Sequence, residues 1–251
     1  MNPKIISLAV FIVAYLLFVV FLKKRTIVAA GASLLLVLLG ALSAKQAFFA
    51  VNWNVMGIFV GTLFLTDIFM ESRVPAFLAE HIVNRTSSIA WAIIAICALA
   101  GFISAFVENV PTVLIVAPIA LALAKRLKIS PVNMLIAIAI CSNLQGTATL
   151  IGDPPSMLLG GFARMNFFDF FFYRGKPSIF FAVELGALAS LPVLYYVFRK
   201  HTQKTVLVAE EKVLSWVPTI MLTAMIVALA LSSFFDTGFS FLAGIICMAF
   251  G

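Results

Sequence analysis

Long apolar runs separated by short polar breaks dominate the pattern of this chain of 251 residues. Residues 5–22 and 26–43 are both apolar, and the basic segment 23–25 separates them. A third run covers residues 54–70. A helix needs roughly 20 residues to cross a bilayer core about 30 Å thick. We therefore predict scaffold spans within residues 1–72.

Residues 73–85 have a different pattern, because apolar and polar positions alternate with a helical period. Their apolar positions 74, 77, 78 and 82 share one helical face, and positions 80, 81, 84 and 85 are polar. This arrangement is typical of a helix that lies in the membrane interface, and we predict an interfacial helix here.

Residues 86–124 contain a single charged residue, Glu108, near the middle. The segment can form two full spans or one re-entrant hairpin. Each arm has only roughly 16–20 apolar residues, and the turn has almost no polar spacer. We therefore favour a hairpin over about residues 88–126 with its tip inside the membrane. Asn109 is expected to cap the second arm, whose first turn contains Pro111.

The apolar segment at about 131–165 is interrupted over residues 142–156, and Asp153 is the single charge between residues 129 and 163. The residues that loosen or stop the helix are Gly146, Gly152, Pro154 and Pro155. Unwound backbone at membrane depth is tolerated only inside protein or beside a wet cavity. An ordinary surface loop would leave both halves too short to cross, so we favour a broken helix. Asp153 is expected to cap its second half.

The rest of the chain completes one predicted repeat and begins another. A span over residues 177–199 closes a transport region at 86–199, and a cytoplasmic loop follows at 200–214. Residues 215–251 hold only two further apolar runs, so we interpret them as the first spans of an incomplete second repeat. Either the second repeat is missing from the sequence as given, or another polypeptide provides it.

The composition excludes several classes of protein. Hydrophobic residues make up 63% of the chain and charged residues 11%, with a mean hydropathy of +1.15. These values exclude a soluble, disordered or nucleic-acid-binding protein. Three cysteines lie in apolar segments and fit neither a disulfide framework nor a zinc site. No Gly-rich loop with Lys-Ser/Thr is visible, so this chain does not hydrolyse ATP.

The basic residues predict an orientation. Of the 17 Lys and Arg, the larger group falls on one face of the predicted topology and is taken as cytoplasmic. It comprises Lys23, Lys24, Arg25, Arg73, Arg85, Lys125, Arg126, Lys128, Arg199, Lys200, Lys204 and Lys212. The smaller group comprises Lys4, Lys45, Arg164, Arg174 and Lys176. This bias places the N-terminus outside.

The two breaks predict one binding site. The helices that follow them can point their positive dipole ends into the same midplane cavity. Asn109, Asn143, Thr147 and Asp153 offer oxygen atoms and are candidate Na⁺ ligands. Inserting a charged carboxylate such as Glu108 or Asp153 at membrane depth costs ~2.5–3.5 kcal/mol. This cost indicates that both residues have a function. The alternatives are proton carriage, sodium binding or, for Asp153 above all, helix capping alone.

Three other features have less certain roles. For Asp67 and Glu184, which also lie within predicted spans, a functional and a structural role both stay open. Residues 167–174 are rich in Phe and are interpreted as an interfacial aromatic anchor.

Two motifs together resemble the ion transporter superfamily. Residues 104–112 read SAFVENVPT, and residues 142–155 begin with SN and end with GTATLIGDPP. In this order and spacing they look most like the branch of arsenite permeases, sodium–proton antiporters and the melanocyte P protein. They are more distantly similar to the divalent-anion sodium symporters of citrate and succinate. The resemblance covers about residues 50–200.

The resemblance implies an all-α, polytopic elevator transporter built from two inverted repeats, usually a homodimer. The residues that match the family's substrate and ion site are Glu108, Asn109, Thr112, Asn143, Gly146, Thr147, Thr149, Gly152, Asp153, Pro154, Pro155 and Ser156. Two of these positions depart from the family's common residue, since Glu108 stands where Asp is common and Ser156 replaces a usual Asn. Gln145, a neighbouring motif position, also replaces a usual Gly. The identity of the transported species therefore cannot be inferred from any one member of the family.

The leading hypothesis is a secondary active transporter for a small ion or anion, coupled to H⁺ or Na⁺. It would lie in the lipid bilayer of a prokaryotic inner membrane, use no cofactor beyond the coupling ion and bind no nucleic acid. One alternative is a half-unit or assembly subunit without transport activity of its own. Another is an intramembrane enzyme that uses Glu108 and Asp153 as an acid/base pair, although a metal-binding His or a nucleophile beside a base is lacking.

Overall fold

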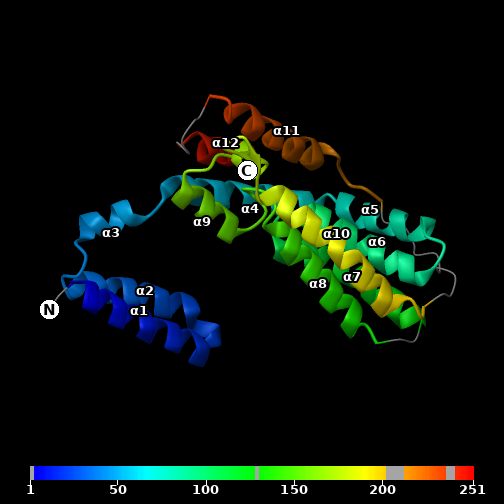
Figure 1. Cartoon of the computed structure of the whole chain (residues 1–251), viewed down its shortest axis with the longest axis horizontal. Helices are drawn as coiled ribbons and strands as arrows, with labels where there is room; N and C mark the ends of the chain where they lie inside the picture. Colours follow the sequence, from blue (N-terminus) through cyan, green and yellow to red (C-terminus); the bar gives the residue numbers. More distant parts are fainter. Residues whose placement is uncertain (1–2, 128–129, 202–211, 236–240) are drawn as a thin grey trace. The chain divides into compact units, whose positions relative to one another are not determined.

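A computed structural model describes residues 3–127, 130–201, 212–235 and 241–251. The chain divides into two compact units, Met1–Asn52 and Trp53–Gly251, and most described residues are helical (Figure 1). Some predictions fall outside the described residues. They concern Lys128 and Lys204 of the charge pattern, most of the predicted loop at 200–214, and the start of the last predicted run.

The first unit contains an apolar helix pair. Helix α1 (Pro3–Val20) connects through the 3₁₀ turn η1 (Leu22–Lys24) to α2 (Arg25–Leu38), and the two helices pack together. Helix α2 has only 14 residues and is shorter than the predicted apolar run 26–43. It ends before Gly40, whose φ of +69° belongs to the left-handed region. At 1.5 Å per residue α2 is about 21 Å long, less than a bilayer core.

A short helix that the apolar pattern did not predict, α3 (Ala44–Ala50), follows in the same unit. It begins with a capping box. The Ser43 hydroxyl accepts from the backbone N–H of Gln46 at 3.2 Å, and the Gln46 side chain accepts from the backbone N–H of Ser43 at 2.9 Å. A serine followed three residues later by glutamine was therefore the available sequence signal.

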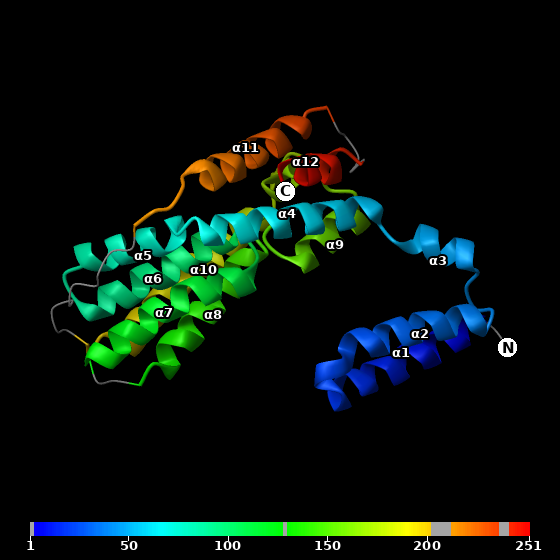
Figure 2. The ribbon, with the colours of Figure 1, turned by 180° about the vertical axis from the view of Figure 1, so that it is seen from behind.

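The second unit carries the predicted transport region. Its elements are α4 (Trp53–Glu71), α5 (Val74–Arg85), α6 (Ile89–Ser104), α7 (Asn109–Leu127), α8 (Val132–Gly146), α9 (Pro154–Ala163), η2 (Phe168–Phe170), β1 (Phe172–Tyr173), β2 (Lys176–Pro177), α10 (Ile179–Phe198), α11 (Val217–Ser232) and α12 (Leu242–Phe250). Helices α5, α6, α7, α8 and α10 form one bundle, and α4 continues from it toward α9, α11 and α12 (Figure 2).

One hydrophobic core joins α5, α6, α7 and α8. Ala79 and Val83 of α5, Ile93 of α6, Leu123 of α7 and Ile138 of α8 are all essentially inaccessible to solvent. Because these residues interlock, the two helices of the predicted hairpin and the first half of the broken helix share one packed body.

Helix α5 differs from the interfacial helix predicted at 73–85. Its bounds agree with the prediction, but its packed face includes Ala79, Val83 and the predicted polar residue Glu80, which is buried. The predicted apolar face is only partly covered, since Phe77 is half-buried. Which face of α5 is buried depends on its packing against α6 and α7. The spacing of apolar residues along the helix does not specify that face by itself.

A second core forms around α4, α11 and α12. Ile58 and Leu65 of α4 pack there with Met225 of α11 and Cys247 of α12. Glycines allow the backbones of α4 and α12 to touch, since a Cβ on Gly57 would lie only 3.1 Å from the Cα of a glycine in α12. Close approach through small residues is a common way to pack helices in membranes.

Among the described residues, three helices are long and apolar enough to cross a membrane, namely α1, α4 and α10. Shorter apolar helical stretches accompany them in α6, α8 and α11, and over Asn109–Lys125 in α7. The largely helical, apolar chain fits a polytopic membrane protein. The all-α prediction needs one correction, because β1 and β2 form a small antiparallel ribbon that pairs Phe172 with Pro177. Arg174 and Gly175, both with positive φ, make its turn.

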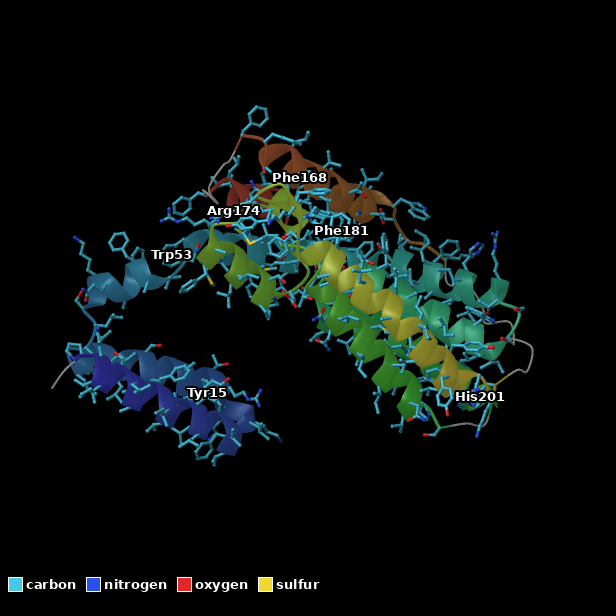
Figure 3. The ribbon with its side chains drawn as sticks, viewed as in Figure 1. Tyr15, Trp53, Phe168, Arg174, Phe181 and His201 are labelled. Atoms are coloured by element: carbon cyan, nitrogen blue, oxygen red, sulfur yellow. The ribbon has the colours of Figure 1, made fainter. Side chains whose placement is uncertain are left out.

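The aromatic segment predicted as an interfacial anchor makes ring contacts with other elements, although Phe168 and Phe172 stay exposed. Figure 3 shows Phe168 and Phe181 near the connection from α9 to α10. The ring of Phe168 lies 5.6 Å from that of Phe234, and the ring of Phe172 lies 5.3 Å from that of Phe181. These contacts place β1 against α10 and η2 against the residues that follow α11, and a role at the membrane interface stays a prediction.

Candidate functional site

The link between α6 and α7 consists of residues 105–108 alone. The two helices pack against each other, so the chain forms the helical pair that the hairpin prediction requires. The depth of this tip in a membrane stays a prediction. We call residues 104–112 the hairpin tip.

The second break is shorter than predicted. Helix α8 continues to Gly146, and the irregular backbone covers only residues 147–153 before α9 begins at Pro154. The expected cap is confirmed, because the Asp153 carboxylate accepts a hydrogen bond of 2.8 Å from the backbone N–H of Ser156. The predicted interruption from residue 142 was therefore placed too early. We call residues 147–153 the helix break.

Hydrogen bonds join the hairpin tip to the last turns of α8. The Asn109 amide donates to Oδ1 of Asn143 at 3.1 Å, and its own Oδ1 accepts from the Ser104 hydroxyl. The Ser142 hydroxyl lies 3.0 Å from Oγ of Ser104 and 3.3 Å from the backbone oxygen of Asn109. These contacts bring together residues from α6, α7 and α8 that are far apart in the sequence.

The helix break also rests directly on the tip. The Thr149 hydroxyl donates to the backbone oxygen of Ala105. A Cβ on Gly152 would lie 2.8 Å from that same oxygen, and a Cβ on Gly146 would overlap the amide of Asn109. Side chains at both glycine positions would push the tip away, so the glycines permit the contact as well as loosening the backbone.

Glu108 belongs to the tip, and two further carboxylates lie in its neighbourhood. Asp67 of α4 and Asp153 of the helix break both lie near enough to Glu108 to repel its negative charge. Oε1 of Glu108 is buried and has no hydrogen-bond partner among the described residues. Thr112 is buried beneath it, and its hydroxyl donates to the backbone oxygen of Glu108 at 2.9 Å. A bound cation would offset this accumulation of negative charge.

Other predicted site residues have local roles in this structure. The Thr147 hydroxyl donates to the backbone oxygen of Leu144 at 3.0 Å. Pro154 and Pro155 are exposed in the first turn of α9, and Ser156 takes part through its backbone N–H. The prediction that Asn109 caps α7 is wrong, because its side chain bonds to α6 and α8 instead.

The candidate Na⁺ ligands are only partly assembled. Asn109 and Asn143 touch each other, whereas Thr147 and Asp153 are engaged in local hydrogen bonds. Among the described residues, no group of three or more His, Cys, Asp or Glu is arranged to hold a metal ion. Amide oxygens and backbone carbonyls at the tip are the donor types that suit a monovalent hard cation.

Sequence reasoning missed two contributors to this arrangement and left the role of a third, Asp67, open. Ser104 and Ser142 belong to the two motifs, yet their hydroxyls were not singled out. Asp67 lies beside Glu108 only because α4 packs against α7 and α9. No sequence signal shows that packing, although an acid inside an apolar run was itself a sign of function.

Comparison with known proteins supplies the family. A model of the citrate transporter family, CitMHS, matches residues 15–251. The chain belongs to the citrate transporter family. It is also 27% identical over 197 residues to an uncharacterized transporter of Mycobacterium bovis, with 76% of this chain and 46% of that protein covered. A 46 kDa membrane protein of Mycobacterium leprae is 29% identical over the same coverage.

The human P protein is 29% identical over 145 residues, which cover 57% of this chain and 17% of that protein. The chain spans about half the length of the mycobacterial relatives it matches. The family confirms the resemblance drawn from the two motifs. Relatives named as transporters are consistent with a transport function rather than a catalytic one. The family and the apolar helices together indicate an integral membrane protein.

Proposed function

We propose that this protein is a secondary active transporter that moves a small carboxylate anion, of which citrate is the leading candidate, together with H⁺ or Na⁺. The observation that carries this proposal is the direct contact between the hairpin tip and the broken helix, made by Asn109 and Asn143. Membership of the citrate transporter family supports the substrate class.

The charges at the tip support coupling to a cation. An anion alone would be repelled by Glu108, whose negative charge is reinforced by Asp67 and Asp153. The N-termini of α7 and α9 supply positive dipole ends that favour an anion. We propose that a cation binds first, near Glu108 and the Asn109–Asn143 pair, and that the anion follows.

An elevator movement agrees with the packing. Helices α6, α7 and α8 share one core, so the tip and the start of the broken helix would travel together. We further propose a homodimer in a prokaryotic inner membrane with the N-terminus outside, as the basic residues indicate. Because the chain spans about half of its mycobacterial relatives, the full site is proposed to include a second, inverted repeat.

Uptake into proteoliposomes tests the proposal. The intact gene product should accumulate citrate only when an inward H⁺ or Na⁺ gradient is imposed, with each gradient varied separately. Glu108→Gln should abolish the gradient-driven uptake, while the matched variant Glu71→Gln, at an exposed acid, should keep it. Uptake by Glu108→Gln at the wild-type rate would contradict the proposal. Wild-type uptake that depends on neither the H⁺ nor the Na⁺ gradient would contradict it as well.

A further inference from the structure

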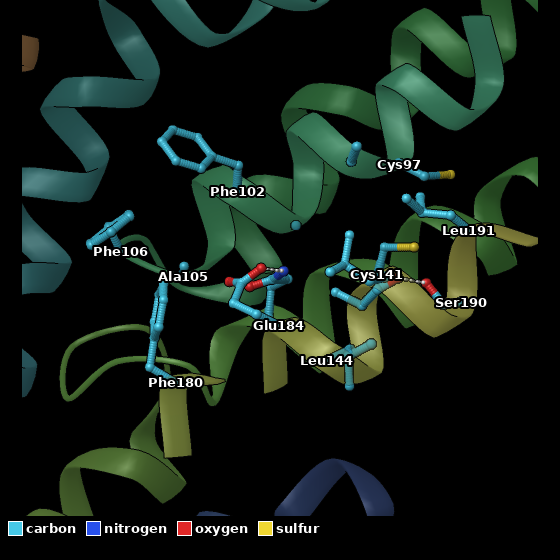
Figure 4. Close-up of a pocket in the computed structure, with 15 residues that line it drawn as sticks. Cys97, Phe102, Ala105, Phe106, Cys141, Leu144, Phe180, Glu184, Ser190 and Leu191 are labelled. Atoms are coloured by element: carbon cyan, nitrogen blue, oxygen red, sulfur yellow. Dashed lines mark hydrogen bonds between the residues drawn. The ribbon is translucent and has the colours of Figure 1, made fainter. Parts of the chain in front are cut away.

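A cavity lies between α6, α8 and α10, and Ala105 and Phe106 of the hairpin tip form part of its wall. It has a volume of about 250 Å³, and Figure 4 shows Cys97, Phe102, Cys141, Leu144, Glu184 and Leu191 around it. Its wall is almost entirely aliphatic, aromatic or thiol. A small apolar chamber with a few convergent polar groups is the usual form of a small-molecule site.

The polar groups of this cavity are concentrated at one place. Nε2 of Gln145 donates a hydrogen bond of 3.2 Å to Oε2 of Glu184, which joins α8 to α10. Oε1 of Gln145 is buried and has no hydrogen-bond partner in the described structure. The hydroxyl of Ser190, the other polar lining group besides the thiols, is already used, since it donates to the backbone oxygen of Ala187 at 2.7 Å.

The ligand chemistry follows from these atoms. The carboxylate of Glu184 and the free amide oxygen of Gln145 are both acceptors, so an incoming group must donate hydrogen bonds. The lining residues include no Lys, Arg or His, and the charge of Glu184 therefore has no basic partner in the cavity wall. A positively charged donor meets both requirements, whereas an anion would be repelled.

Gly101 helps to place this polar group. A Cβ at that position would lie 2.9 Å from Cγ of Gln145 and 3.3 Å from the backbone oxygen of Cys141. Helix α6 thus leaves room for the Gln145 side chain, which can reach Glu184 instead of turning back along its own helix.

We propose that the cavity binds a small amphipathic amine, with its ammonium group between Glu184 and Gln145 and its apolar body among Phe102, Leu144 and Leu188. The ammonium of an ethanolamine phospholipid is the less suitable source. Its phosphate would enter the cavity close behind the amine, and the wall offers no basic group to receive it. The cavity shares part of its wall with the hairpin tip, but amine binding in it does not require the proposed transport activity.

Equilibrium binding to the purified protein in detergent tests the proposal with three probes of nearly equal shape. They are cyclohexylmethylamine, cyclohexylmethanol and cyclohexanecarboxylate. The amine should bind saturably, and the alcohol and the carboxylate should bind at least roughly tenfold more weakly, because a charge-assisted hydrogen bond is lost. Equal affinity of the three probes, or no saturable amine binding, overturns the proposal without any variant. Ethanolamine phospholipid that displaces the amine with equal affinity would overturn the choice of source.

Two variants locate the site. Glu184→Gln should weaken amine binding roughly tenfold or more and leave the affinity for the alcohol nearly unchanged. Ala187→Phe should fill the cavity and remove binding of both probes while Glu184 keeps its charge. Glu71→Gln, at an acid outside the cavity, is the matched control. Wild-type affinity for the amine in either folded variant would overturn the assignment of the site to this cavity. If neither variant folds, the comparison of the three probes on the wild-type protein tests the proposal.

Discussion

The side-chain amide of Asn109 donates a hydrogen bond to Oδ1 of Asn143 across 3.1 Å. This bond joins the first residue of α7 to the last turn of α8, and thus joins the two segments whose motifs suggest transport. Asn143 is exposed and also donates to the backbone oxygen of Ala139 at 2.9 Å. The side chain is therefore held in place from its own helix while it meets the tip.

Asn143→Ala removes this bond and should slow citrate uptake by about tenfold or more, because among the described residues only the hydrogen bonds of Ser142 then join α8 to the tip. The cost in stability should be small, roughly 0.5–1.5 kcal/mol. Uptake into proteoliposomes and thermal unfolding in detergent measure the two effects. Asn133→Ala, at an exposed position near the start of the same helix, is the control and should change neither.

Asp153→Asn separates capping from ion binding. Asparagine accepts the same hydrogen bond from the Ser156 N–H, so the melting temperature should stay close to that of the wild type. If the negative charge serves transport, uptake should still fall sharply. Asp153→Ala, in contrast, should also lower stability by roughly 0.5–2 kcal/mol. Full activity in the stable Asn variant would assign Asp153 to capping alone.

Gly152→Ala should separate the helix break from the hairpin tip. The added Cβ would lie 2.8 Å and 2.9 Å from the backbone oxygens of Ala105 and Ser104, and backbone atoms cannot move aside easily. We expect a loss of roughly 1–3 kcal/mol in stability together with loss of uptake. Gly31→Ala meets no atom within 4 Å and should be neutral or slightly stabilising in its helix. A Gly152→Ala protein as stable and active as this control would argue against the close contact.

Asp67→Asn should weaken the coupling cation without unfolding the protein. The exposed Asp67 carboxylate adds negative potential beside Glu108, and its removal should raise the half-saturating cation concentration roughly threefold or more. Uptake measured against Na⁺ and against pH identifies which cation responds. The Glu71→Gln variant provides the comparison, and identical cation dependence in the two variants would remove Asp67 from the site.

Local signals predicted the parts of the fold that depend on local chemistry. Asp153 before two prolines indicated both the start of α9 and its cap, and the structure has both. The apolar runs indicated most helices. The length of the second predicted span was overestimated, because the chain turns at Gly40 and α2 ends before it. The turn of the ribbon at Arg174 and Gly175 was not recognised, although Gly is typical of such turns.

The missing parts of the candidate site depend on packing between distant segments. Helix α8 continues past residue 141 since Ser142 and Asn143 make contacts with the tip that favour the helical conformation there. The approach of Asp67 to Glu108 likewise depends on how α4 lies against α7. A single sequence shows which residues are polar in an apolar surrounding, but not which of them meet.

The glycine contact between α4 and α12 has a mechanical consequence. A Cβ on Gly61 would overlap the backbone of Cys247, and one on Gly57 would nearly touch that of Gly244. Main chains in direct contact have no long side chains between them that could change rotamer and let one helix slide along the other. The two helices therefore behave as a single rod, and any stroke that displaces Asp67 along the membrane normal must also displace α12.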